Sequence, residues 1–235
     1  MSCKVYLLRH TPDPDDLVVA AARICYNDIS AGNLLKRKEE SSEESSSERL
    51  LKELWRGGHH SPFEHVSFTF GVDGLSRVTS HQLVRHRVAS YSQQSQRYVH
   101  MDRPEVVMPP SVASDPESCA LFEGQVEAAH EVYKALMERG VPAEDARFIL
   151  PHGWETRLVL TMNARELHHF FNLRLCRRAQ WEIRELSRLM LSQCRKAAPL
   201  VFSLAGPSCV MGRCEEVRPC GRPYKNMEDL LATNE

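Results

Sequence analysis

The sequence predicts an α+β protein in which an antiparallel sheet is flanked by helices, in a single domain spanning residues 1–235. Helical segments dominate the chain, and the few strand-like runs alternate apolar and polar residues. Strands and helices do not alternate in the manner of a doubly wound sheet. The chain also has no GxGxxG and no GxxxxGK[ST] motif, so a nucleotide would not bind on a dinucleotide-binding βαβ unit or a P-loop.

The sequence of the N-terminal quarter indicates one strand and two helices. Lys4–Leu8 alternates enough for an opening strand, and the apolar, alanine-rich segment Asp16–Cys25 predicts a helix. Lys36–Glu48 has no apolar residue and predicts a solvated polar insert. A second helix is expected over Glu48–Arg56, ended by the glycine pair that follows it.

The next segment predicts a strand, a short helix and a polar stretch. Val66–Val72 alternates as a half-buried strand does, and Gly74 is expected to end it. Ser76 can cap a helix running to about Val84. Ala89–Val99 is polar and partly alternating, which fits a strand or irregular structure.

The second half of the chain is mainly helical. Helices are predicted over Asp115–Arg139 and from Pro142 through Ile149, followed by a short strand at Leu158–Met162. Asn163 then begins a helix with Glu166 as its capping box. One more helix and an irregular tail complete the prediction, at Ala179–Ala198 and from Gly206 onward.

Composition excludes several classes of protein. Apolar residues make up 42% and charged residues 26% of the chain, which excludes a disordered or fibrous protein. The formal net charge of -1 predicts neither a nucleic-acid nor a membrane partner. The absence of a signal-peptide pattern leads us to expect a cytoplasmic protein with free thiols. The tail cysteines Cys209, Cys214 and Cys220 lack the CxxC spacing of a structural zinc site, and no metal is expected.

Positive charge is concentrated in one segment. Leu75–Met101 contains four arginines, three histidines and no acidic residue, among many serines and glutamines. Such a set suits a phosphate-bearing ligand, because the guanidinium fork binds phosphate oxygens in pairs. A basic loop paired with distant carboxylates is the alternative, and a single-stranded nucleic acid is a weaker one because aromatic residues are few.

Two further polar stretches stand out. Asn163–Arg184 places basic and amide groups on two sides of a helix, which suggests contact with two pockets or with another subunit. His59, His60, Glu64 and His65 could together form the metal site of a metallohydrolase. Pro62 interrupts them, however, and favours a turn whose polar groups line a ligand site.

One motif resembles a known family. Arg85–Tyr98 reads RHRVASYSQQSQRY, which is similar to the signature of the flavin-dependent thymidylate synthases: RHR, seven residues, a serine and then an arginine two positions on. HxSPFEH, DARFILP, NAR and NLR follow the order expected of that family. The resemblance runs from about Leu17 to Pro199.

The resemblance implies an enzyme that makes dTMP from dUMP. Methylenetetrahydrofolate would donate the carbon, and FAD reduced by NADPH would carry the hydride. The family forms homotetramers in which several subunits build each active site.

The resemblance also assigns roles by motif position. It implies that FAD is contacted by Ser61, Arg85, His86, Arg87, Gln93, Asn163, Arg165 and His169. It implies that dUMP is contacted by Gln82, Arg85, Gln93, Ser95, Gln96, Arg97, Arg147 and Arg174, and Arg77 is a plausible addition.

Arg174 is the expected catalytic residue, because it occupies the position that the family uses to polarise the uracil ring and favour loss of the N3 proton. Such a guanidinium makes carbon 5 reactive without a protein nucleophile. Ser95 could be proposed as that nucleophile, but no base is assigned to activate it, and a positioning role is preferred.

Overall fold

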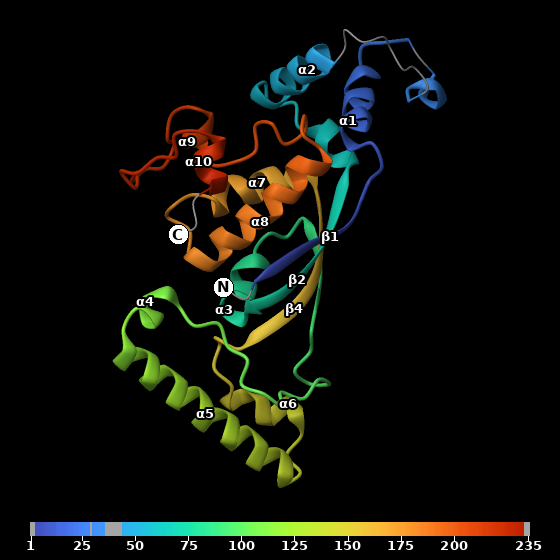
Figure 1. Cartoon of the computed structure of the whole chain (residues 1–235). Helices are drawn as coiled ribbons and strands as arrows, with labels where there is room; N and C mark the ends of the chain where they lie inside the picture. The colour runs from blue at the N-terminus through green and yellow to red at the C-terminus, as the bar shows by residue number, and fades with distance from the viewer. Residues whose placement is uncertain (1–2, 29, 36–43, 233–235) are drawn as a thin grey trace. The chain divides into compact units, whose positions relative to one another are not determined.

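The computed structural model describes residues 3–28, 30–35 and 44–232. The described residues contain a four-stranded antiparallel sheet with strand order β1-β2-β4-β3. Its strands are β1 (Lys4–His10), β2 (Ser67–Ser76), β3 (Ala89–Gln93) and β4 (Glu155–Asn163). β4 enters the sheet between β2 and β3, and the hydroxyls of Thr69 and Thr161 meet across β2 and β4 at 2.9 Å. The sheet and its helices confirm the predicted α+β class (Figure 1).

Most helices begin and end near their predicted bounds. The α-helices are α1 (Pro14–Arg23), α2 (Glu44–Arg56), α3 (Arg77–Leu83), α4 (Pro110–Ala113), α5 (Pro116–Glu138), α6 (Ala143–Ala146), α7 (Ala164–Arg174), α8 (Trp181–Ala197), α9 (Ser208–Met211) and α10 (Met227–Ala232). Three 3₁₀ helices lie at Ala31–Asn33, Ser61–His65 and Arg147–Ile149.

Side-chain caps fix several helix starts, as the sequence predicts. Thr79 N–H donates to the Ser76 hydroxyl at 3.1 Å, and Ser118 N–H donates to the Asp115 carboxylate at 2.9 Å. Glu166 N–H donates to the Asn163 side chain at 2.9 Å. These bonds satisfy amide groups that the first turn of a helix leaves unpaired.

The structure corrects three sequence predictions. Gly74 does not end β2: it adopts a positive φ of 69° within the strand, a conformation that glycine tolerates without ending the run. The polar insert is shorter than predicted, because α2 already begins at Glu44. Lys52 pairs with Glu48 at 2.6 Å, an i,i+4 pair that supports the part of α2 that was predicted. The remainder of the predicted insert, residues 36–43, lies outside the described residues.

The tail is the third correction, because it contains α9 and α10 where irregular chain was predicted. Pro207 precedes α9 as its N-cap residue. Leu230 of α10 is buried, and Arg188 of α8 donates to the Leu231 carbonyl at 3.0 Å. Contacts with α8, rather than a periodic pattern, therefore stabilise the last helix.

The chain divides into two compact units. Unit 1 consists of Met1–Lys4, Val72–Arg85 and Tyr91–Val159, and unit 2 of Val5–Gly71, His86–Ser90 and Leu160–Glu235. Both units are built from discontinuous segments. The single-domain organisation of the whole chain remains a prediction.

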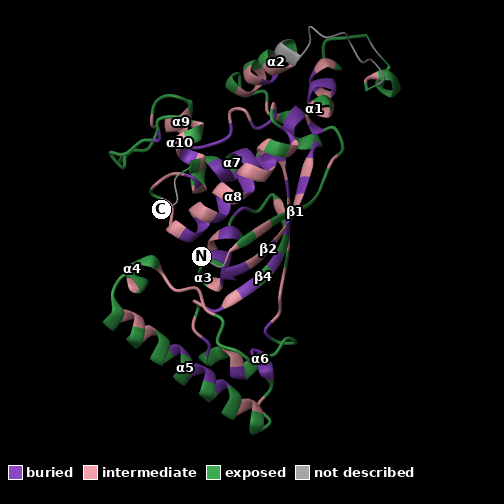
Figure 2. Ribbon diagram, in the orientation of Figure 1, coloured by how far each residue is buried: buried purple, intermediate pink, exposed green. Residues whose placement is uncertain are grey.

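Each unit has its own buried apolar cluster. In unit 1, Val126 and Tyr133 on one side of α5 pack with Ala146, Leu150 and Trp154 (Figure 2). In unit 2, the core consists mainly of buried side chains from β2, α7, α8 and the segment after α8: Phe68, Phe170, Phe171, Leu186, Met190 and Phe202. Burial of such side chains stabilises each unit by roughly 1.5–3 kcal/mol per residue. No helix in the described residues is long and apolar enough to cross a membrane.

Candidate functional site

Unit 1 carries a group of three arginines, which we call the arginine cluster: Arg77, Arg97 and Arg147. The Ser76 cap makes Arg77 the first residue of α3, and its backbone N–H donates to the Trp154 carbonyl at 3.1 Å. Arg147 begins the 3₁₀ helix that continues α6. Arg77 and Arg147 are therefore positioned by helical backbone, whereas Arg97 lies in the turn that follows β3.

The arginine cluster has more positive charge than its described neighbours neutralise. Arg77 is partly buried, and its Nη1 atom is buried without a hydrogen-bond partner among the described residues. Burial and the nearby charge of Arg147 lower the pKa of Arg77. Glu144 serves both other arginines: its carboxylate pairs with Arg97 at 2.8 Å and its carbonyl accepts from Arg147 Nε at 3.0 Å. A bound anion would relieve this imbalance.

The glutamines and serine of the signature motif also belong to unit 1. Gln93 Nε2 donates to the hydroxyls of Ser80 and Thr156, both at 3.1 Å, which fixes its side chain. Gln96 is buried, with a relative exposure of 7%. The Ser95 hydroxyl accepts from the backbone N–H of Arg97 at 3.2 Å. This contact orders the loop and supplies no base that could activate Ser95 as a nucleophile.

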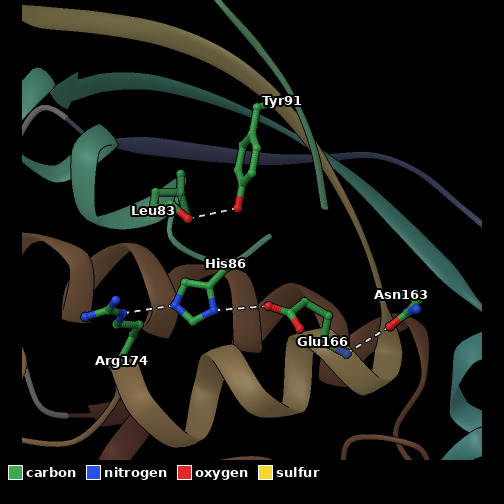
Figure 3. A network of polar contacts seen from close by, with 6 residues as sticks. All are labelled: Leu83, His86, Tyr91, Asn163, Glu166 and Arg174. Atoms are coloured by element: carbon green, nitrogen blue, oxygen red, sulfur yellow. Dashed lines mark hydrogen bonds and ion pairs between the residues drawn. The ribbon is translucent and has the colours of Figure 1, made fainter. Parts of the chain in front are cut away.

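Two other predicted dUMP contacts lie at the end of α3. Gln82 is half-buried and Arg85 is exposed, and the backbone N–H of Arg85 donates to the Gln82 carbonyl at 3.3 Å. Tyr91 of β3 donates its hydroxyl to the Leu83 carbonyl at 2.9 Å in the same unit (Figure 3). The signature motif is thus tied back to the helix that precedes it.

Unit 2 contains a different arrangement, which we call the His86 network: His86, Glu166 and Arg174. His86 lies between the two partners, with Nδ1 3.2 Å from a Glu166 oxygen and Nε2 accepting from Arg174 Nε at 3.0 Å (Figure 3). Both partners come from α7. Arg174 can donate only to an unprotonated nitrogen, so Nδ1 carries the proton and donates it to Glu166.

The electrostatics of the His86 network fit this neutral form. The His86 side chain is buried, and burial lowers its pKa to about 4, with Arg174 and His169 adding to the shift. Burial raises the pKa of Glu166 and lowers that of Arg174. His86 is therefore neutral near pH 7, and its hydrogen bonds fix the plane of the Arg174 guanidinium.

The predicted FAD contacts other than Arg85 and Gln93 belong to unit 2. Asn163 caps α7, while Arg165, one residue into that helix, forms an ion pair with Glu64. Arg87 and His169 are exposed, and the His169 ring centre lies 5.7 Å from that of His86. These groups are cationic or neutral donors, a set that suits an anionic, hydrogen-bonding ligand.

The histidine-rich stretch before β2 forms a turn, as the interrupting proline predicts. Ser61–His65 is a 3₁₀ helix, and the predicted FAD contact Ser61 is exposed at its start. The His60 ring stacks on Trp55 at 4.0 Å, and its Nε2 lies 3.0 Å from the Trp55 carbonyl. Because His60 and Glu64 are engaged with protein groups, the contacts do not favour the metallohydrolase interpretation.

Sequence reasoning missed two residues that shape the site. Glu166 was recognised only as a capping residue, yet its carboxylate pairs with His86. His168 is fully buried, stacks on Trp55 at 3.8 Å and meets the Val201 carbonyl at 2.9 Å. Neither contact has a sequence signal, because each partner is distant in the chain.

A cavity of about 280 Å³ in unit 1 is not lined by the predicted dUMP residues. Gln94, His100, Arg103, Trp154 and Arg157 are among the residues that surround it. The unit thus brings Arg77, Arg97 and Arg147 together but does not enclose them in this cavity.

Comparison with known proteins gives a consistent result. A family profile described as thymidylate synthase complementing protein (Thy1) matches residues 6–200. A flavin-dependent thymidylate synthase from Geobacter sulfurreducens is 50% identical over 215 residues, covering 91% of each chain. One from Pyrococcus horikoshii is 43% identical and covers 91% of this chain and 90% of its own.

A solved structure is also similar to this chain. It is that of a UMP/dUMP methylase, PolB, from Streptomyces cacaoi bound with 5-Br dUMP, with a TM-score of 0.73 and 28% identity. The similarity covers 87% of this chain and 96% of the other.

Proposed function

The chain belongs to the family of flavin-dependent thymidylate synthases, and from this premise we propose that it methylates dUMP to dTMP. In this proposal methylenetetrahydrofolate donates the carbon, and FAD, reduced by NADPH, carries the hydride. The strongest support for the proposal is the arginine cluster of unit 1, in which a buried Arg77 nitrogen has no hydrogen-bond partner among the described residues and Arg147 lies near it.

The arginine cluster fits the phosphate of dUMP. A nucleoside monophosphate brings nearly two negative charges and several acceptor oxygens. Its phosphate would give the Arg77 Nη1 atom an acceptor and offset the repulsion between Arg77 and Arg147. Arg97 would exchange its exposed Glu144 partner for phosphate at little cost, because exposed ion pairs contribute little. Gln82, Arg85, Gln93, Ser95 and Gln96 would complete the dUMP site.

The polar residues of unit 2 fit FAD. The exposed cations Arg87 and Arg165, with Asn163, His169 and Ser61, would hold its phosphates and polar groups, together with Arg85 and Gln93 of the signature motif. His86, the remaining residue of the expected FAD set, is buried and would act through the groups that it orients. Glu64, the exposed partner of Arg165, can be replaced by an anionic cofactor. When bound, FAD supplies the hydride chemistry, and the protein supplies orientation and electrostatics.

Arg174 would act on the uracil ring. The His86 network fixes its guanidinium plane, and partial burial strengthens the field it exerts. Beside the O2/N3 edge, such a cation stabilises the negative charge that develops as N3 loses its proton and carbon 5 becomes nucleophilic. No covalent bond to the protein is needed in this scheme.

We further propose that the enzyme is a homotetramer with shared active sites. Arg165 and Arg174 lie nine positions apart in α7, so at about 100° per residue they face opposite sides of the helix. A helix with functional groups on two sides suits an assembly in which a second subunit completes each site.

The proposal is tested by assaying dTMP formation from dUMP with the purified protein. Product should form only when methylenetetrahydrofolate and NADPH are present and the protein carries FAD, so omission of either substrate or removal of the bound flavin should abolish it. Formation of dTMP without flavin, or no formation from the complete mixture by a flavin-loaded protein, would contradict the proposal.

A further inference from the structure

Four of the eight cysteines of the chain line one cavity in unit 2. The cavity has a volume of about 320 Å³ and lies between the C-terminal part of α7 and the tail. The four residues, which we call the cysteine set, are Cys176, Cys209, Cys214 and Cys220. All four are free thiols. The spacing argument from the sequence applied only to the three tail cysteines. Cys176 is distant from them in the chain, and the fold brings it to the same cavity.

Two cysteines of this set have backbone donors aimed at their sulfur atoms. The N–H of Arg222 donates to Cys220 Sγ at 3.4 Å. Gly221 between them has a φ of 74°, a left-handed turn that brings this amide back toward the sulfur. The N–H of Arg178 donates in the same i+2 pattern to Cys176 and opposes the rise in pKa that burial causes there. Backbone donors stabilise a thiolate over a thiol, and such outer contacts orient metal ligands.

The charges around the cavity are mixed, and the nearby Glu216 helps to raise the pKa of Cys176. Arg177 and Arg222 line it, together with Glu215 and Glu216. A divalent ion held by four thiolates has a net charge of -2, which the two guanidinium groups oppose and the two carboxylates add to. The Arg177 guanidinium is held in place by stacking on the Tyr224 ring, 4.1 Å from its centre.

The segment between α9 and α10 is mostly exposed, although Tyr224 within it is buried. Val217 is 97% exposed and Met211 41% exposed, and the segment between α9 and α10 has no regular structure. A segment without a core is commonly held by a disulfide or a metal ion. A disulfide needs an oxidant to form, whereas the binding of zinc to thiols releases only protons.

We propose that Cys176, Cys209, Cys214 and Cys220 bind one zinc ion that fastens the tail to the end of α7. Zinc prefers four ligands at tetrahedral geometry, and thiolates are among its preferred ligands. Cys209 and Cys214 have four residues between them, at the upper end of the spacing common in structural sites.

The site must close on the ion. Among the described residues, no three of these sulfur atoms lie within 4.8 Å of one another, so the cysteine side chains must turn inward on binding. Cys220 is exposed and the other three are partly exposed, which leaves them room to rotate.

The test uses the full chain, purified without chelator and under reducing conditions. Elemental analysis should find about one zinc per chain, and X-ray absorption should find sulfur neighbours at about 2.3 Å. Cys220→Ser should lower the zinc content several-fold. Cys25→Ser, which changes an exposed cysteine outside the cavity, should leave it unchanged.

Limited proteolysis provides a second readout on the unmodified protein. A chelator should accelerate tryptic cleavage in the tail at Arg213 and Arg218, and added zinc should restore protection. The inference is overturned by a chain that binds no zinc when supplied with it, by oxygen or nitrogen ligands only, or by a disulfide within the cysteine set. The zinc measurements require no flavin or dUMP, so their outcome is independent of the enzymatic proposal.

Discussion

The arginine cluster of unit 1 and the His86 network of unit 2 differ in how far their polar groups are paired within the protein. In the arginine cluster Arg97 and Arg147 share Glu144, and a buried Arg77 nitrogen has no hydrogen-bond partner among the described residues. In the His86 network both ring nitrogens are occupied, and a neutral histidine links a carboxylate to a guanidinium. The first arrangement suits a charged ligand that comes and goes. The second suits a side chain that must keep one orientation.

The largest expected effect is at Arg174. Arg174→Ala should reduce turnover about 100- to 1,000-fold, because it removes the cation that we propose stabilises developing charge on the uracil ring. Bound FAD should remain, since the predicted flavin contacts are other residues. The measurement is dTMP formation at saturating dUMP, together with the flavin content of the variant. Turnover near that of the unchanged protein would remove Arg174 from its proposed role.

A second, smaller effect is expected at Arg77. Arg77→Ala should weaken dUMP binding about 10- to 150-fold, the range for losing a hydrogen bond to a charged group. Deoxyuridine, which has no phosphate, should bind equally to both proteins. Arg139→Ala, which removes an exposed arginine at the end of α5, is the matched control. Equal losses for dUMP and deoxyuridine would show that Arg77 does not recognise the phosphate.

Glu144 should have the opposite effect. Glu144→Gln removes the internal competitor for Arg97 and should tighten dUMP binding about two- to fivefold, a small gain because the ion pair is exposed. The gain should shrink as salt concentration rises. Titrations at low and high salt provide the measurement, and weaker binding by the variant would contradict the assignment of Glu144 as a competitor.

The smallest effect concerns stability in acid. His86 and His168 have folded-state pKa values of about 4, below the value of about 6.5 for unfolded chains. The unfolded state therefore binds more protons between pH 6.5 and 4, and stability should fall as the pH is lowered through this range. The raised pKa of Glu166 works in the opposite direction and reduces the net change.

His168→Phe should flatten this pH dependence by about one proton on unfolding. The measurement is the denaturation midpoint as a function of pH, compared between the variant and the unchanged chain. An identical pH dependence in both proteins would mean that His168 does not titrate as its burial requires.

The sequence predicted helices well where a capping residue precedes a segment with helical periodicity of its apolar residues. Asp115 and Asn163 both cap the helices that their positions predict. Gly74 misled the prediction, because a glycine with positive φ can lie inside a strand as well as end one. The strand order could not be predicted, since the position of β4 between β2 and β3 depends on pairing over a long stretch of chain.

The candidate site was predicted by residue type and motif, but its internal geometry was not. The lack of acidic residues in Leu75–Met101 indicated an anion site, and the arginine cluster is consistent with it. The pairing of Glu166 with His86 joins residues 80 positions apart, and no local pattern encodes it. For the same reason Cys176 could not be grouped with the tail cysteines before the fold was known.

The most direct test of the central claim is the visible absorption spectrum of the purified protein before and after addition of dUMP. We predict an oxidised-flavin band that shifts with dUMP, and a shift that needs a much higher dUMP concentration in Arg77→Ala. A protein that stays colourless after incubation with FAD, or a flavin band that does not respond to dUMP, would contradict the account.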